Sequence, residues 1–161
     1  MESIKIPELV TKISIGTFWK CSNLTSVTIP DSVTEIGNYA FSECSSLTSI
    51  NIPNGITSIG YQVVTNCSKL SKVIIPDIAS WVELEIIHEI SNPLMIAHHL
   101  YSDEETEITD LVIPEGVTKI GMFAFSGCSG LKSVTFPESL TNIGYGAFSN
   151  CSGIEDLFLS K

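Results

Sequence analysis

Five cysteines are the side chains of this 161-residue chain best suited to metal binding or redox chemistry. They stand at Cys21, Cys44, Cys67, Cys128 and Cys151, and the interval between neighbours within each run is constant. No pair has the short Cys-x-x-Cys spacing of a zinc site. Equivalent side chains of stacked repeats lie about 4.8 Å apart, whereas the Cβ atoms of a disulfide lie about 3.8 Å apart. The spacing therefore predicts free thiols that pack in a core.

Histidines beside acidic residues raise the alternative of a metal site between residues 75 and 107. The pattern His-Glu-x-x-His is absent, because Asn92 stands where the second histidine would be. Neighbouring histidines on the strand expected there face opposite sides of it, and the acidic turn 103–105 lacks the alternating ligands and the glycine of a calcium loop. We therefore expect no metal and no cofactor at these residues, which are His88, His98, His99, Glu83, Glu85 and Glu89.

Serine nucleophiles are the remaining candidates for catalysis. The chain has no Gly-x-Ser-x-Gly motif, and Ser42, Ser126 and Ser149 recur at equivalent positions of a repeat. An active site needs a unique arrangement of residues, whereas these positions are periodic. We expect the protein not to be an enzyme, with a hydrolase or metal enzyme centred on residues 75–107 as the remote alternative.

The composition limits the partners. Hydrophobic residues make up 43% of the chain, and its net charge is −10, from 18 acidic and 8 basic residues. This charge repels phosphate, so nucleic acid and anionic membranes are poor partners. The sequence has no run of eighteen apolar residues and no secretory signal at its start, so we expect no membrane insertion. Because a repeat begins almost at Met1, we expect a piece of a longer array.

A 23-residue unit recurs along the chain, as in IPDSVTEIGNYAFSECSSLTSIN from Ile29 to Asn51. Other copies begin near residues 6, 52, 113 and 136. In each unit, proline stands at the second position and aliphatic residues at the fifth and eighth. Phenylalanine or valine stands at the thirteenth position, and cysteine at the sixteenth. A unit of this length cannot bury its apolar face alone, so the copies must stack into a solenoid.

Each unit is expected to contain one short strand. Around Leu47 to Pro53, apolar and polar residues alternate, which predicts a strand with Ile50 and Ile52 inward, and Pro53 ends it. The strands of stacked units form a parallel sheet. GNYAFSEC predicts a helical turn or 3-10 segment on the other side. A tight turn or positive φ explains a recurring glycine, for which only Ser14 is an exception: Gly37, Gly60, Gly121 and Gly144.

An irregular long repeat occupies residues 75–112. The interval from Ile75 to Ile113 exceeds one regular unit by more than half a unit. Asn92-Pro93 predicts a turn, and residues 99–111 read as a hairpin with an acidic turn. Spaced apolar residues predict a short helix that begins near Asp77; they are Ile78, Trp81, Val82, Leu84, Ile86 and Ile87.

The motif LxxLxxIxIPxxVxxIGxxAFxxCxx resembles the BspA-like leucine-rich repeats of bacterial surface proteins. It stands at Leu24–Cys44, Leu47–Cys67 and Ile108–Cys128. The resemblance implies one α/β right-handed leucine-rich-repeat solenoid over residues 1–161. Short parallel strands would line its concave face, and turns with short helical or 3-10 segments its convex side.

The long repeat is also similar to a degenerate unit of BspA-like arrays. The matching points are Trp81, Ser91 to Leu94, Ala97 and Leu100-Tyr101. This similarity favours an integral coil of unusual length over an inserted domain.

The outward residues of the predicted strands form a surface that we call the strand face. Solenoids commonly bind extended partners on such a face, but threonine and serine also simply tolerate a crowded parallel ladder, and both interpretations stand. Ile74 and Phe158 belong to the same outward series. The candidate protein-binding residues are Thr25, Ser26, Thr28, Thr48, Ser49, Asn51, Lys72, Ser133 and Thr135.

Aromatic residues recur on the convex side of the units. Tyr39, Tyr61, Phe123 and Tyr145 follow the glycine position. They suit either a protein interface or half-buried packing between coils.

These patterns favour a non-catalytic binding module. By the resemblance, it belongs to a cell-surface or secreted bacterial protein that binds a protein ligand, such as a host matrix protein, in adhesion. A structural spacer that projects another domain is the alternative. Neither Met1–Lys5 nor Leu157–Lys161 resembles a polar cap, so we also expect end-to-end self-association.

Overall fold

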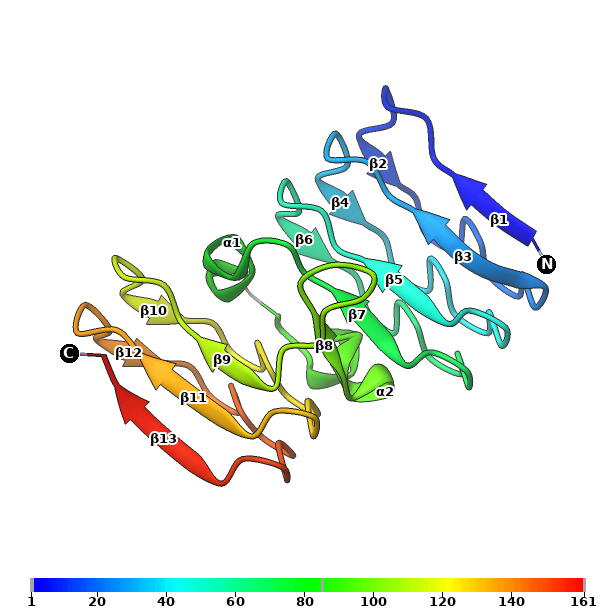
Figure 1. Ribbon diagram of the computed structural model, residues 1–161. Coiled ribbons are helices and arrows are strands. Elements are labelled where there is room, and N and C mark those ends of the chain that lie inside the picture. Colours follow the sequence, from blue (N-terminus) through cyan, green and yellow to red (C-terminus); the bar gives the residue numbers. More distant parts are fainter. Residues whose placement is uncertain (1, 85, 161) are drawn as a thin grey trace.

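The chain winds into about seven stacked turns, with parallel strands on two sides (Figure 1). This computed structural model describes residues 2–84 and 86–160. The fold class predicted from the repeat is confirmed. The strand face carries a sheet in the order β1 (Glu2–Lys5), β3 (Leu24–Thr28), β5 (Ser49–Asn51), β7 (Lys72–Ile74) and β8 (Leu100–Tyr101), and a second sheet of β9 (Asp110–Val112), β11 (Ser133–Phe136) and β13 (Asp156–Leu159).

The register of the ladders confirms the period of the repeat. Ser26 pairs with Ser49, and Val134 pairs with Leu157, so equivalent residues of neighbouring coils lie side by side. The long coil is the exception, because Val73 pairs with Leu100, and the interval between these two exceeds the regular period. A coil that is longer between its strands is therefore accommodated within the same parallel sheet.

Two further sheets on another side of the solenoid were not predicted. They consist of two-residue strands around the eighth-position isoleucine, which is buried in most coils. Such strands are too short for an alternation pattern to reveal them. They are β2 (Lys12–Ile13), β4 (Glu35–Ile36) and β6 (Ser58–Ile59) in one sheet, and β10 (Lys119–Ile120) and β12 (Asn142–Ile143) in the other.

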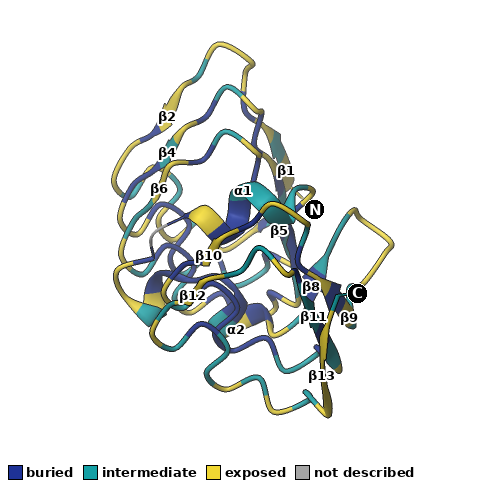
Figure 2. Ribbon diagram, turned by 90° about the vertical axis from the view of Figure 1, so that its left-hand side faces the viewer, coloured by how far each residue is buried: buried dark blue, intermediate teal, exposed yellow. Residues whose placement is uncertain are grey.

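Buried apolar residues of the stacked coils form one core cluster, and Figure 2 shows the buried segments that recur along the stack. The inward positions Ile50 and Ile52 are buried, as predicted, and Phe41 is fully buried. The rings of Phe18 and Phe41 stack with centroids 5.2 Å apart, as do those of Phe125 and Phe148. The thirteenth position of the repeat thus forms aromatic stacks along the core.

The recurring glycine is required by close packing and not by positive φ. Gly37 and Gly60 have ordinary negative φ values, so the explanation from positive φ was wrong. A Cβ on Gly60 would lie 2.4 Å from the backbone nitrogen of Asn38, and one on Gly37 would lie 2.7 Å from that of Ile15. Ser14 holds this position in the first coil, where the described residues contain no earlier coil for its Cβ to meet.

The convex side of the regular coils consists of hydrogen-bonded turns. Ser42 N–H donates to the Tyr39 carbonyl, and Cys44 N–H donates to the Phe41 carbonyl. Tyr39 and Glu43 take left-handed conformations, with φ of 57° and 62°, which prevents a continuous helix. A left-handed non-glycine residue costs roughly 1–2 kcal/mol. We call these two positions of each coil its left-handed corners.

The helices in the described residues lie in the long coil. They are α1 (Ile78–Glu83), the 3-10 helix η1 (Glu89–Ser91) and α2 (Leu94–Ala97). Asp77 caps α1 as predicted, since its carboxylate accepts from the Ala79 N–H at 3.0 Å. The helix is shorter than the apolar spacing suggested, and Ile87 is 72% exposed.

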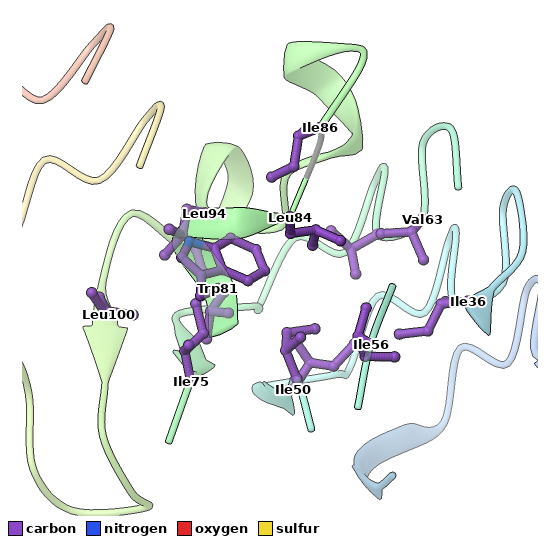
Figure 3. Packing of buried hydrophobic residues seen from close by; sticks show 14 of the residues in the cluster. Ile36, Ile50, Ile56, Val63, Ile75, Trp81, Leu84, Ile86, Leu94 and Leu100 are labelled. Atoms are coloured by element: carbon purple, nitrogen blue, oxygen red, sulfur yellow. The ribbon is translucent and has the colours of Figure 1, made fainter. Parts of the chain in front are cut away.

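Buried residues join the long coil to the core on both sides. Figure 3 shows Trp81 among Ile75, Leu84 and Leu94, all pointing into the interior. Asn92 and Pro93 lie between η1 and α2, where the predicted turn falls. The long coil is thus packed as part of the stack.

The predicted hairpin at the end of the long coil is only partly formed. Tyr101 and Glu107 make an isolated antiparallel bridge, and Ser102 N–H donates to the Thr106 carbonyl. The strand β9 that follows pairs in parallel with β11 and not with β8. The hairpin therefore divides the strand face into two sheets.

The buried phenylalanine stack gives the first prediction. Replacing Phe41 with alanine removes a fully buried ring from between two coils, which should lower the free energy of unfolding by about 3–5 kcal/mol. Urea denaturation followed by circular dichroism measures the change. The exposed Thr28→Ala is the control, expected within about 0.5 kcal/mol of the parent; equal stability of the two variants would contradict core stacking at this position.

Candidate functional site

The nine candidate residues of the strand face lie on two sheets. Seven of them are on or beside β3, β5 and β7, whereas Ser133 and Thr135 are on β11, beyond the hairpin of residues 102–107. All nine are exposed or half-buried. The structure thus brings the first seven together and separates the other two from them.

Several hydroxyl and amide groups of the strand face are already bonded to neighbouring coils. Thr48 Oγ1 donates to the Thr25 carbonyl at 3.1 Å, and Thr25 Oγ1 donates to the Glu2 carbonyl at 3.1 Å. The Asn51 amide donates to the Ile29 carbonyl at 2.8 Å and accepts from the Ile29 N–H at 3.0 Å. These three side chains therefore extend the backbone ladder, which is what a structural role for the polar residues predicts.

The hairpin covers another part of the strand face. Lys72 Nζ donates to the Glu104 carbonyl at 2.8 Å and lies 4.7 Å from the centre of the Tyr101 ring. Ile74, predicted to point outward, is only 5% exposed beside its register partner Tyr101. The core cluster includes its neighbours Val73 and Ile75 but not Ile74, so Ile74 is covered on the strand face, because the long coil supplies a neighbour that a regular coil lacks.

The serine hydroxyls of the strand face differ in whether they already make a hydrogen bond. Ser26 and Ser49 are register partners and make no side-chain hydrogen bond within the described residues. Ser133 Oγ donates to Asp110 Oδ1 at 2.6 Å. Ser26 and Ser49 therefore keep hydroxyl groups available to a partner.

The cysteines pack as predicted, as free thiols in or beside the core. The Cys67 thiol donates to the Phe41 carbonyl, with Sγ and O 3.1 Å apart, and Cys44 does the same to Phe18 at 3.1 Å. Burial raises the pKa of Cys67 to about 12 and that of Cys44 to about 11. Thiols with such pKa values are poor nucleophiles at neutral pH.

The histidines do not converge. His98 ends α2 in a left-handed conformation and its Nδ1 lies 2.9 Å from the Gly127 carbonyl oxygen, whereas His99 Nδ1 lies 2.6 Å from Glu107 Oε1. Neither belongs to a strand, so the strand argument for their opposite directions was wrong. Within residues 2–84 and 86–160, no group of three potential ligands gathers. Glu85, another candidate, lies outside the described residues.

Glu89, which the sequence suggested only as a possible metal ligand, fastens the long coil to the coils after it. Glu89 Oε1 accepts from the hydroxyls of Ser126 and Ser149 at 2.6 and 2.7 Å, and from the Asn150 amide at 3.2 Å. The Ser126 hydroxyl bond, followed by that of Ser149, lowers the pKa of Glu89. Recurrence of serine at 126 and 149 was visible in the sequence, but nothing there connected it to Glu89.

The stacked parallel coils and their repeating core residues define a leucine-rich-repeat solenoid. A model of the BspA type leucine rich repeat region matches residues 1–88 and 95–161 in six copies, so the chain belongs to that family. The match extends into the long coil on either side of residues 89–94. No curated protein matches the sequence.

Solved structures agree with this family. A leucine rich cell surface protein from Faecalibacterium prausnitzii is 32% identical over 99% of this chain and 42% of its own, with a TM-score of 0.52. A leucine rich repeat protein of T. pallidum is 25% identical over 97% of this chain and 68% of its own, with a TM-score of 0.58. The chain is therefore similar to bacterial leucine-rich-repeat proteins and spans less than half of the first.

A third solved structure supports the fold alone. The pneumococcal vaccine antigen PcpA is 18% identical over 98% of this chain and 39% of its own, with a TM-score of 0.53.

Among the described residues, no helix is both long and apolar enough to cross a membrane.

The Glu89 contacts give the second prediction. Glu89→Ala leaves three donors without their carboxylate, which should cost about 1–3 kcal/mol of unfolding free energy at neutral pH. Because the folded-state pKa of Glu89 is lowered, this stabilisation is complete above the unfolded value of 4.5 and is lost as the pH falls through the folded value. Urea denaturation at neutral and at acidic pH should show a difference between parent and variant that shrinks in acid.

The exposed Glu83 on α1 provides the control. Glu83→Ala removes a carboxylate that has no side-chain partner within the described residues, and its effect should stay within about 0.5 kcal/mol. Equal losses for Glu83→Ala and Glu89→Ala would contradict the fastening role of Glu89.

Proposed function

We propose that this chain is a non-catalytic protein-binding module of a bacterial cell-surface or secreted protein, which binds a protein such as a host matrix protein in adhesion. The observation that carries the proposal is the contrast between the two sides of each strand. Inward positions repeat from coil to coil, whereas outward positions differ, as in Val112, Thr135 and Phe158 at equivalent places. Variation on a scaffold of constant geometry is how solenoids distinguish partners.

Apolar exposure on the second part of the strand face also supports binding. Val112 and Phe158 flank Thr135 in register and are 62% and 51% exposed. Exposed apolar side chains in one row favour contact with another protein. The net charge of −10 would draw basic partners toward this surface.

A spacer that projects another domain is the second candidate function. It is supported by the hydroxyls of Thr25 and Thr48, which are used in the ladder between coils. The remote alternative, a metal-dependent enzyme in the long coil, has no group of three candidate ligands among the described residues to support it.

End-to-end association of copies is a further part of the proposal. Within the described residues, β1 pairs only with β3 and β13 only with β11, so each offers an edge for pairing. Leu157 and Leu159 of β13 are exposed. Met1 and Lys161, at the ends of the expected contact segments, lie outside the described residues.

The third prediction concerns the strand face. The immobilised chain should bind at least one protein in a panel of extracellular-matrix proteins, and the pair Ser26→Arg with Ser49→Arg should weaken that binding about tenfold or more, because two bulky charges would occupy adjacent positions. Surface plasmon resonance measures the dissociation constants.

Ser58→Arg on β6 is the matched control. Ser58 is exposed on the other sheet, so its substitution should leave binding unchanged. A folded chain that binds no protein of the panel would favour the spacer, and equal weakening by Ser58→Arg would remove the strand face as the binding surface.

A further inference from the structure

A hollow of about 660 Å³ lies on the convex side of the first three coils, away from the strand face. Its lining includes Trp19 from the first coil, Tyr39 and Glu43 from the second, and Gln62 and Asn66 from the third. We propose that this hollow binds a neutral glycan of one or two sugar rings. Its volume falls within the range of about 300–1,000 Å³ typical of small-ligand sites.

Two aromatic side chains are exposed in the hollow and held in fixed orientations. Trp19 is 53% exposed, and its indole Nε1 donates to Glu43 Oε1 at 3.1 Å. Tyr39 is 38% exposed and makes an edge contact with Tyr61, with ring centres 6.0 Å apart and planes at 86°. Exposed aromatic rings that are already immobilised lose little entropy when a ligand stacks on them.

The charges at the hollow are balanced within the chain. The Lys20 ammonium lies 4.0 Å from Glu43 Oε2 and 4.5 Å from the centre of the Trp19 ring. Glu43 thus has one oxygen engaged by the indole and the other beside a cation. A cationic ligand would have to compete with Lys20, and an anionic ligand would meet the overall charge of −10. An uncharged ligand meets neither obstacle.

Backbone strain marks the same residues. Tyr39, Glu43, Gln62 and Asn66 are the left-handed corners of the second and third coils, with φ between 52° and 62°. Gly16 and Gly146 stand at the corner that Tyr39 and Gln62 occupy, whereas the corner of Glu43 and Asn66 is held by Lys20, Gly127 and Asn150 in other coils. Tyr39 and Gln62 therefore keep side chains at a strained corner where two other coils have glycine, which points to a compensating role for them.

Packing between aromatic rings accounts for the left-handed residue Phe123 in another coil, but it does not account for the side-chain amides of Gln62 and Asn66. Phe123 is also left-handed, and its ring makes an edge contact with Tyr145 at 5.5 Å. The amides of Gln62 and Asn66 have no hydrogen-bond partner within the described residues. They therefore stand beside two aromatic rings with their donors and acceptors free.

This combination matches the chemistry of a sugar ring. A pyranose has a face of C–H groups that stacks on an aromatic ring, and hydroxyl groups at its edge that donate and accept hydrogen bonds. Side-chain amides supply both functions in one plane, and aromatic faces supply the apolar contact. A purely apolar ligand would leave the amides unpaired, which costs binding energy.

The test is a screen of the purified chain against an array of neutral oligosaccharides, followed by calorimetric titration of those that bind. Trp19→Ala and Tyr39→Gly should each weaken binding about tenfold or more. Tyr39→Gly places at this corner the residue that Gly16 and Gly146 provide in other coils, so it should remain folded and keep the parent melting temperature. Tyr145→Ala, which removes an exposed aromatic of another coil, is the control and should bind like the parent.

Tryptophan fluorescence gives an independent readout. The chain has two tryptophans, Trp81 in the core and Trp19 at the hollow. Bound sugar should therefore protect the accessible tryptophan from quenching by acrylamide, and the protection should disappear in Trp19→Ala.

Three results would overturn the proposal. They are a complete array without a binder, sugar binding that persists in both Trp19→Ala and Tyr39→Gly, and protection of Trp19 that depends on protein concentration alone. The last would assign the hollow to contact between copies of the chain. Each outcome is separate from the strand-face test, whose paired variants lie on β3 and β5.

Discussion

Backbone contact between neighbouring coils, at one fixed distance, is the constraint on which the rest of this solenoid depends. The Gly60 N–H donates to the Ile36 carbonyl at 2.7 Å, and the Gly37 N–H donates to the Ile13 carbonyl at 2.8 Å. At that distance no Cβ fits at the glycine position. Because the regular coils repeat this contact, they also repeat the buried residues around it, from the eighth-position isoleucine to the cysteine, as in Cys67, whose thiol bonds to the coil before.

The long coil shows how the stack continues where the repeat fails. The helix α1 replaces a short strand, and the Val82 carbonyl near its end accepts from Gly121 N–H at 2.7 Å. Side chains supply the other connections, since Trp81 Nε1 donates to the Ala124 carbonyl at 2.8 Å and the Asn92 amide donates to the Phe123 carbonyl at 2.7 Å. In this coil, individual side chains therefore make the hydrogen bonds to the next coil that a periodic backbone ladder makes in the others.

Periodic features could be predicted from the sequence, and contacts between non-equivalent residues could not. The period predicted the inward Ile50 and Ile52 and the thiol packing, and the apolar spacing after Asp77 predicted the helix start there, because each depends on local pattern or on copies in register. The role of Gly60 was misassigned, since a single chain segment does not reveal how near the next backbone lies. The burial of Ile74 and the bonds of Glu89 also depend on the path of the long coil. The candidate strand-face residues stay a prediction, although Thr48 and Asn51 are now seen to serve the ladder.

The stability of Gly60→Ala relative to Ser14→Ala tests the central constraint most directly. Both substitutions place alanine at the same position of the repeat, but only Gly60 has the backbone of an earlier coil against it. Urea denaturation should show a loss of about 1–3 kcal/mol or more for Gly60→Ala and a change within about 0.5 kcal/mol for Ser14→Ala. A Gly60→Ala variant as stable as the parent would contradict the claim that backbone contact sets the spacing of the coils.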